Sequence, residues 1–473
     1  MKKLLLSASM LMLAGASAFA VTDGQTYESV DGINCENLWV LDRQHTEDAY
    51  KANPIASTSA RTATTDGTTV YVGLSGETAT IEKFDLKTGA YLGSLAVTVN
   101  GEALKDGLSV NQVGFDDYGH FYAATYADNR QGKLTQYKLY IVDLETGAAT
   151  LAGDLLFDGG LGRLDYCDVV GDLTGVNAGA TVMSVTCDAD DMNVFKWVRA
   201  KGSEEWAGGW TGGATFQPIA AGQTYPNGIT GFANGSVIKI VRDEKTKNGE
   251  VNMFYIDGMT SLPALYGSDG AMIDNIGNAD LKKTNKETGE TTGTIPEPAA
   301  GANGIAEGHV GNVNLMIYPE GQYDGTHSCQ AVITTVDENM SFESMKYLWM
   351  VPADGLGKTS DTGTRVHSLF CLPQEDGSAY LLTFKCFNGM GVYKITKKDE
   401  DSVESNVVAA ANITVNGDVI AVSEVAETIE VFNVAGQKVA EARNASEVAA
   451  PATGAYIVKA VVAGAPVVKK VIL

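Results

Sequence analysis

The acidic stretch CDADDMN, residues 187–193, is the first candidate for chemistry in this chain. Asp188, Asp190 and Asp191 could offer carboxylate oxygens to a metal ion, and calcium is the ion that such ligands suit. The stretch lacks the glycine and the distal glutamate of an EF-hand loop. A solvated acidic turn is therefore the favoured interpretation, and the sequence predicts no cofactor other than this calcium alternative.

A pair of tryptophans forms the second candidate, in the glycine-rich stretch EEWAGGWTGG, residues 204–213. Trp206 and Trp210 are four residues apart, and flat indole rings on a loop could stack on sugars or anchor a partner. The favoured alternative is that both rings pack between structural units. They are kept as candidate ligand-binding residues.

Residue types that perform catalysis do not gather into a recognised motif. The sequence has no G-x-S-x-G elbow, phosphate-binding loop or dinucleotide fingerprint. The histidines show no metal-ligand spacing, and they are His45, His120, His309, His327 and His367. No catalytic residue is predicted, and whether the protein is an enzyme stays open, leaning towards no.

Composition narrows the class of protein. The chain has a net charge of −24, which disfavours nucleic acid as a partner. With 44% hydrophobic and 19% charged residues it can bury a large core. The six cysteines form no C-x-x-C pair, so disulfides and buried apolar thiols are both open: Cys35, Cys167, Cys187, Cys329, Cys371 and Cys386.

An internal repeat indicates which elements must position these candidates. DLKTGA at residues 85–90 matches DLETGA at residues 143–148, each between two short alternating strands. An Asp-Leu-x-Thr-Gly turn suits a hairpin, because aspartate bonds its own backbone and glycine tolerates positive φ. Repeated strand-rich units of about 40–50 residues are typical of a β-propeller.

A second signal, a glycine followed by an apolar strand, recurs six times in the first 400 residues. It stands at Gly67, Gly119, Gly179, Gly235, Gly325 and Gly377. The long gap before the fifth copy indicates an insertion at residues 269–303. We therefore predict an all-β fold with a six-bladed propeller over residues 21–396; five or seven blades are alternatives. The strand at residues 36–43 should close the ring by pairing with the last blade.

The two ends of the sequence indicate where the protein is transported. Residues 1–20 have a basic start, an apolar run and an Ala-x-Ala site, as in a secretory signal peptide. No other segment is apolar for long enough to span a membrane, so we expect no transmembrane segment in the mature chain. Residues 397–406 are charged and read as a linker. Residues 407–473 contain short alternating strands, which predict a small Ig-like β-sandwich.

Three motifs in this last segment resemble the C-terminal sorting domain of type IX secretion cargo proteins from Bacteroidetes. They are VFNVAGQKV, GAYIVK and the terminal KKVIL, whereas APATG departs from the Leu-Pro turn that is more frequent in the family. The matching residues are Gly436, Gln437, Val439, Gly454, Tyr456, Ile457, Val458, Lys459, Lys470 and Ile472.

The resemblance implies export across the outer membrane by the secretion machinery, with the cargo released or kept at the cell surface. The first functional hypothesis is thus a secreted or cell-surface propeller that binds an extracellular glycan or protein. The alternative is an extracellular propeller hydrolase or lyase that acts on polysaccharide or peptide. Carboxylates or histidines that meet in the central channel would favour the alternative.

Overall fold

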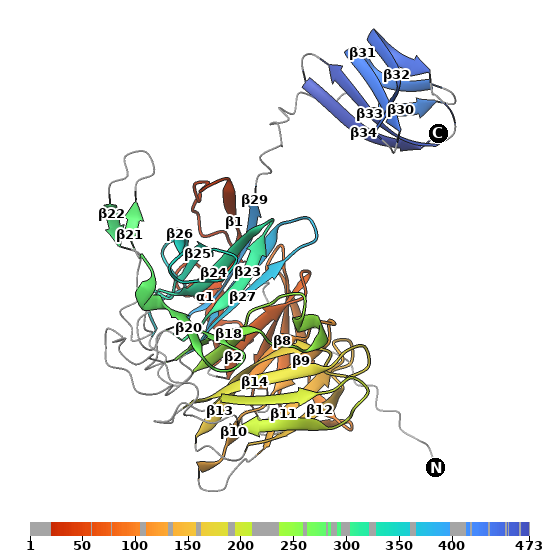
Figure 1. Cartoon of the computed structure of the whole chain (residues 1–473). Helices are drawn as coiled ribbons and strands as arrows, with labels where there is room; N and C mark the ends of the chain where they lie inside the picture. Colours follow the sequence, from red (N-terminus) through yellow and green to blue (C-terminus); the bar gives the residue numbers. More distant parts are fainter. Residues whose placement is uncertain are drawn as a thin grey trace, which may run out of the picture. The chain divides into compact units, whose positions relative to one another are not determined.

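A computed structural model shows two compact units, residues 1–397 and 398–473 (Figure 1). It describes the whole chain except residues 1–19, 58, 77, 105–109, 131–135, 158–161, 188–193, 211–235, 259–262, 281, 285–290, 295–302, 321–327, 360–365, 398–412, 417–418, 434–435, 450–451, 453, 463–464 and 473. The predicted signal peptide therefore lies outside the described residues except for Ala20, and the linker does so beyond its first residue. The described helices are short and the strands many, so the predicted all-β class is confirmed.

The first unit contains six antiparallel sheets of four or five strands, each a blade of a propeller. Blade 1 has β2 (Ala60–Thr65), β3 (Thr69–Leu74), β4 (Thr80–Asp85) and β5 (Tyr91–Ala96). Blade 2 has β8 (Gln112–Phe115), β9 (Phe121–Ala124), β11 (Gln136–Val142) and β12 (Ala149–Leu156). Blade 3 has β13 (Arg163–Gly171), β14 (Ala180–Cys187), β15 (Val194–Arg199) and β16 (Trp206–Trp210), with β10 (Ala127–Asp128) added beside β13.

The other three blades follow the same order from the inner to the outer strand. Blade 4 has β17 (Val237–Ile240), β18 (Met253–Asp257), β19 (Ala264–Gly267) and β20 (Met272–Asn275). Blade 5 has β23 (Ala306–Val310), β24 (Val313–Pro319), β25 (Ala331–Val336) and β26 (Lys346–Val351). Blade 6 has β27 (His367–Pro373), β28 (Ala379–Lys385), β29 (Gly389–Lys397) and β1 (Ile33–Asp42).

Short elements lie between the blades. They are α1 (Glu47–Lys51), the 3-10 turns Pro54–Ala56, Thr246–Asn248 and Ile276–Asn278, and the hairpins β6 (Thr98–Val99) with β7 (Glu102–Ala103) and β21 (Lys282–Thr284) with β22 (Thr291–Thr294).

The ring is closed by the N-terminal strand. β1 pairs with β29 from Ile33–Lys397 to Asp42–Gly389, so the outer strand of blade 6 comes from the start of the propeller. This confirms the predicted pairing of residues 36–43. Trp39 extends the closure to blade 1, because its indole Nε1 donates to the carbonyl oxygen of Leu86 at 2.8 Å. Its ring also stacks on Phe84.

The repeated Asp-Leu-x-Thr-Gly segments form the predicted hairpin turns. Asp85 Oδ1 accepts from the backbone nitrogen of Thr88 at 2.8 Å, and Asp143 Oδ1 accepts from that of Thr146 at 2.8 Å. The turn glycines have φ of +68° at Gly89 and +75° at Gly147. The conformation thus requires the glycine that the repeat supplies.

The glycine signal gives the right number of blades, although it does not mark the same turn in all six. Gly67, Gly119, Gly179 and Gly377 lie between the first and second strands of blades 1, 2, 3 and 6. Gly235 and Gly325 lie outside the described residues, and the chain at 235 precedes β17. The corresponding turns of blades 4 and 5 instead contain Gly249 (φ +79°) and Gly311 (φ +54°).

The predicted insertion at 269–303 starts too early. Met272–Asn275 is the outer strand β20 of blade 4, and it pairs with β19. Its short length and the glycines beside it hide its strand character in the sequence. The small β21–β22 hairpin follows it, so the extra chain lies between blades 4 and 5.

The second unit is a small all-β domain. β31 (Val419–Asn433) pairs with β30 (Ile413–Asn416) through its first half and with β33 (Ala455–Val462) through its second half. β32 (Lys438–Ala449) pairs along β31, and β34 (Ala465–Ile472) pairs with β33. Apolar residues from all five strands form one core, which suits the predicted sandwich.

Ring closure by Trp39 can be tested by substitution. Trp39→Ala should lower the free energy of unfolding of the mature protein by about 3–5 kcal/mol, because a large side chain that is only 1% exposed is removed between two blades. Urea unfolding followed by circular dichroism measures the change. Leu92→Ala is the control, since Leu92 is 54% exposed and should cost less than about 0.5 kcal/mol. Equal effects of the two substitutions would contradict the closure role.

Candidate functional site

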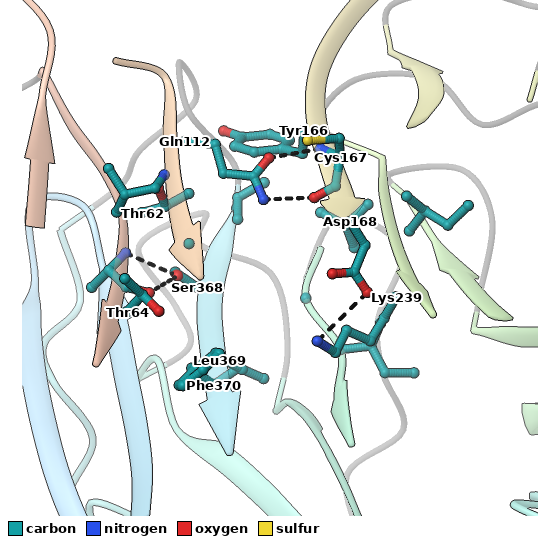
Figure 2. Close-up of a pocket in the computed structure, with 18 of the residues that line it drawn as sticks. Thr62, Thr64, Gln112, Tyr166, Cys167, Asp168, Lys239, Ser368, Leu369 and Phe370 are labelled. Atoms are coloured by element: carbon teal, nitrogen blue, oxygen red, sulfur yellow. Dashed lines mark hydrogen bonds and ion pairs between the residues drawn. The ribbon is translucent and has the colours of Figure 1, made fainter. Parts of the chain in front are cut away.

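A cavity of about 110 Å³ lies at the centre of the propeller (Figure 2). Its walls come from the innermost strands β2, β8, β13, β17 and β27 and from residues 304–305, which lead into β23. All six blades therefore contribute to it. The lining mixes apolar groups, such as Leu369 and Phe370, with hydroxyl, amide and charged groups.

Side chains on two walls of the cavity bond to the backbone of the next blade. Ser368 Oγ accepts from Ala63 N at 3.1 Å and donates to Ala63 O at 3.2 Å, which joins β27 to β2. Thr62 Oγ1 accepts from Val113 N at 2.9 Å, which joins β2 to β8. These bonds satisfy inner-edge backbone groups that have no neighbouring strand in their own sheet.

The same arrangement continues around the ring. Figure 2 shows Gln112 paired with Cys167: the amide Nε2 donates to Cys167 O and Oε1 accepts from Cys167 N, both at 2.6 Å. Asp168 accepts from Ile240 N at 2.7 Å. Asp257 accepts from Gly304 N at 3.0 Å, which joins blades 4 and 5. Below, the term inner clamps means these contacts together with those of Ser368 and Thr62.

Asp168 is also the centre of the cavity's charged groups. Arg242 donates to both of its carboxylate oxygens, from Nη1 at 2.9 Å and from Nη2 at 3.0 Å. Lys239 Nζ lies 3.6 Å from Asp168 Oδ2. Burial alone would raise the pKa of Asp168, but the two cations outweigh it and hold this pKa below its ordinary value. Asp168 is therefore an ionised, paired carboxylate.

Glu307 is a buried carboxyl group close to the same cations. Burial raises its pKa, and Lys239 and Arg242 oppose that rise only in part. It does not line the cavity, whose only carboxylate in the described lining is Asp168. The described lining thus does not supply the pair of free carboxyl groups that glycoside hydrolysis ordinarily uses.

His367 lines the cavity as a buried, uncharged imidazole. Its Nε2 lies 2.5 Å from Thr383 Oγ1, and the Lys385 ammonium donates to Val366 O at 3.2 Å nearby. Burial, followed by the charge of Lys385, lowers the pKa of His367 to about 3. This histidine therefore stays neutral at physiological pH and is poorly suited to act as a base there.

One group in the described part of the chain has the composition of a metal site: Asp116, His120 and Asp172. His120 Nδ1 lies 2.9 Å from Asp116 Oδ2 and 3.5 Å from Asp172 Oδ1. The carboxylate oxygens already accept other bonds, for example Asp116 Oδ2 from Leu173 N at 2.9 Å. The group is better explained as a polar contact between blades 2 and 3 than as a metal centre.

Of the candidate ligand-binding and metal-binding residues that the sequence singled out, only Trp206 has a described side chain, and it does not line the cavity. Trp206 is half-buried in β16, and its Nε1 donates to Ala152 O of blade 2 at 2.9 Å. It therefore packs between blades, and the side chain of Trp210 lies outside the described residues. Asp188, Asp190 and Asp191 also lie outside them. Cysteines that the structure describes as buried and outside any disulfide are Cys35, Cys167, Cys329, Cys371 and Cys386.

Residues of the sorting motif lie on the second unit. Gly436 (φ +76°) forms the turn between β31 and β32, where Gln437 N donates to Asn433 Oδ1 at 3.0 Å. Tyr456 is buried in β33 and packs against Gly454. The described motif residues that are exposed to solvent are Gly436, Gln437, Val439, Ile457, Lys459 and Lys470.

Comparisons with known proteins give fold-level neighbours only. No family model matches the chain, and no curated protein matches it. A DUF4623 family protein from Bacteroides eggerthii is 11% identical, with 80% of this chain and 78% of that chain covered and a TM-score of 0.47. A putative 6-phosphogluconolactonase from Bacteroides uniformis is 14% identical (87% and 88% covered, TM-score 0.32).

A third neighbour is an α-L-arabinofuranosidase from Fusarium graminearum, 10% identical, with 72% of this chain and 93% of that chain covered and a TM-score of 0.35. The similarities are too low to carry an argument about function. Among the described residues, no helix is both long and apolar enough to cross a membrane.

Burial of neutral His367 predicts a specific pH dependence. The unfolded chain takes up a proton near the ordinary pKa of 6.5, whereas the folded chain does so only near 3. Stability from this group is therefore present above about pH 6.5 and is lost as pH falls towards 3. Between pH 7 and pH 5 the free energy of unfolding should fall by about 2 kcal/mol through His367 alone.

His367→Gln should remove this contribution in urea unfolding at the two pH values, while His309→Gln, at an exposed position of β23, should leave the wild-type dependence. An unchanged pH dependence in the His367 variant would show that this imidazole is not held neutral.

Proposed function

We propose that this protein is a secreted or cell-surface propeller that binds an extracellular glycan through its central cavity without catalysing a reaction there. The observation that carries the proposal is the state of the cavity's carboxylate. Asp168 accepts two bonds from Arg242 and two from backbone nitrogens, those of Val169 and Ile240. It is thereby held as a structural anion, which leaves the cavity to bind rather than to react.

The size and lining of the cavity favour a sugar over a protein segment. About 110 Å³ is well below the roughly 300–1,000 Å³ of sites for drug-sized ligands. A single sugar ring at the end of a glycan suits such a space better than a folded surface. Phe370 lines it as a partly buried ring, and aromatic faces pack well against the C–H face of a sugar.

We propose further that the second unit directs export through a type IX-like secretion machinery. Its support is the sequence resemblance, together with a self-contained core and exposed motif residues, among them Gln437, Lys459 and Lys470. Because each unit is compact, we expect the sorting signal of the second unit and the ligand site of the first to act independently.

Glycan binding can be tested with the purified mature chain on a panel of extracellular polysaccharides and their oligosaccharides. The wild-type protein should retain at least one of them. Phe370→Ala should weaken that binding about ten-fold, because it removes the aromatic face from the cavity wall. The outer strands of the blades should stay intact. Leu92→Ala is the matched control on an outer strand and should bind as the wild type does. Binding that survives the loss of Phe370 would place the ligand site elsewhere.

The export proposal predicts where a shortened chain goes. In a bacterium with a type IX system, the intact chain should reach the surface or the medium, whereas a chain that ends at residue 406 should stay in the periplasm. Cell fractionation with immunodetection measures both. The first unit ends at residue 397, so the shortened chain should unfold at the wild-type propeller midpoint. Equal export of the two chains would refute the sorting role.

A further inference from the structure

We infer that the sugar bound in the cavity is acidic, and that its carboxylate is held by the ammonium group of Lys239. This inference rests on the proposed function, since it takes the cavity as the ligand site. It adds the chemical class of the ligand: a uronic acid or a related carboxylate-bearing sugar, free or at the end of a glycan.

The side-chain hydrogen-bond acceptors of Asp168, Gln112 and Ser368 on the cavity wall already accept hydrogen bonds from other protein groups. Each oxygen of Asp168 accepts one bond from Arg242 and one from a backbone nitrogen. A carboxylate offers about four such positions. The side-chain oxygen of Gln112 accepts from Cys167 N, and that of Ser368 accepts from Ala63 N. A ligand that approaches with donors, such as an ammonium group, therefore meets few free acceptors on these side chains.

The ammonium group of Lys239, in contrast, has hydrogen-bond donors that Asp168 does not satisfy. Its ammonium carries three N–H groups, and its ion-pair partner, Asp168 Oδ2, lies 3.6 Å away, which is beyond hydrogen-bond length. The side chain is only 18% exposed. A largely buried cation without a hydrogen-bond acceptor is costly, so the site favours a ligand group that brings both an acceptor and a negative charge.

Thr64 is a second, independent indication of a ligand. It lies in β2, on a different wall from Lys239 (Figure 2), and it is 1% exposed. Its Oγ1 has no hydrogen-bond partner within the described structure, although buried hydroxyl groups are nearly always paired. Its neighbour Thr62, two residues earlier on the same strand, uses its hydroxyl in an inner clamp. Thr64 thus has a hydroxyl available for a sugar oxygen.

Local charge decides between an acidic and a neutral ligand. Arg242 faces two carboxylates, Asp168 at 2.9 Å and Asp117 at 3.4 Å. Burial raises the pKa of Glu307, and Lys239 and Arg242 oppose that rise. The protein's net charge of −24 repels anions over long distances, but salt screens this effect beyond about 8 Å under physiological conditions. Inside the cavity Lys239, whose ion pair with Asp168 at 3.6 Å leaves its N–H groups without a hydrogen bond to that carboxylate, should dominate.

The inference is tested by comparing sugars that differ only in the acid group. Isothermal titration calorimetry on the full mature chain would compare D-galacturonate with D-galactose and D-glucuronate with D-glucose. Short oligogalacturonides would test whether the acidic sugar is bound at the end of a glycan. At least one acid should bind ten-fold or more tightly than its neutral partner. Lys239→Met keeps the length of the side chain and removes the charge, and it should abolish this preference.

Two further variants separate the contributions. Thr64→Val, which is nearly isosteric, should weaken the acid and its neutral partner by a similar factor, because the hydroxyl contacts the ring and not the carboxylate. Lys346→Met removes an exposed lysine of β26 and should leave both affinities unchanged. Thermal unfolding of each variant confirms that the propeller is intact before the affinities are compared.

Failure of this inference and failure of the proposed function give different results. If glycans bind in a Phe370-dependent manner but no acid is preferred, the cavity binds sugars and the acidic class is wrong. If Lys239→Met keeps the preference, the carboxylate is held by another group and the role given to Lys239 is wrong. If the polysaccharide panel, acidic members included, shows no binding, the proposed function itself is wrong.

Discussion

The propeller depends on the way its innermost strands are joined. Each of these strands has an edge that is wholly unpaired in its own sheet or, in β13, is paired with β10 only at Arg163 and Leu164. Backbone N–H and C=O groups that are buried at the unpaired parts must find other partners. The inner clamps of Ser368, Thr62, Gln112 and Asp168 meet this requirement by bonding to the backbone of the neighbouring blade. The ring is thus held at its centre by polar contacts and, further out, by apolar packing between blades.

This construction explains why the cavity contains polar groups but few that are free. A clamp residue that turned towards a ligand would leave a buried backbone group unsatisfied, at a cost of about 1–3 kcal/mol. Asp168 has the further task of balancing Arg242, which also bonds to Val169 O at 2.8 Å. Carboxylate chemistry at this point would therefore compete with the joint between blades 3 and 4.

The sequence predicts the parts of this architecture that are encoded locally. Asp85 and Asp143 bond to their own turns, so the repeat is readable within six residues. The glycine signal shows the limit of such local prediction, because it does not mark the first turns of blades 4 and 5. In blade 4 this turn lies at Gly249 and follows a four-residue strand, which is too short to be recognised as an alternating pattern. The cavity was not predictable, because Thr64, Lys239 and Ser368 are each more than a hundred residues apart in the sequence, and nothing local distinguishes them from other strand residues.

Under the proposed function, the selectivity of the cavity depends on the polar groups that the inner clamps do not use. Ser368 and Gln112 are committed to the backbone, so recognition must come from Lys239, Thr64 and the partly buried rings on the wall. A neutral sugar could engage these donors only through hydroxyl groups that water solvates equally well, and it would gain little over water. A carboxylate gains more, because a charge-assisted bond in a partly dehydrated cavity is stronger than one in bulk solvent. Under this proposal, the stability of the propeller and its choice of ligand share one cause: backbone groups use the acceptors of the inner clamps, so a ligand that supplies its own acceptor is favoured.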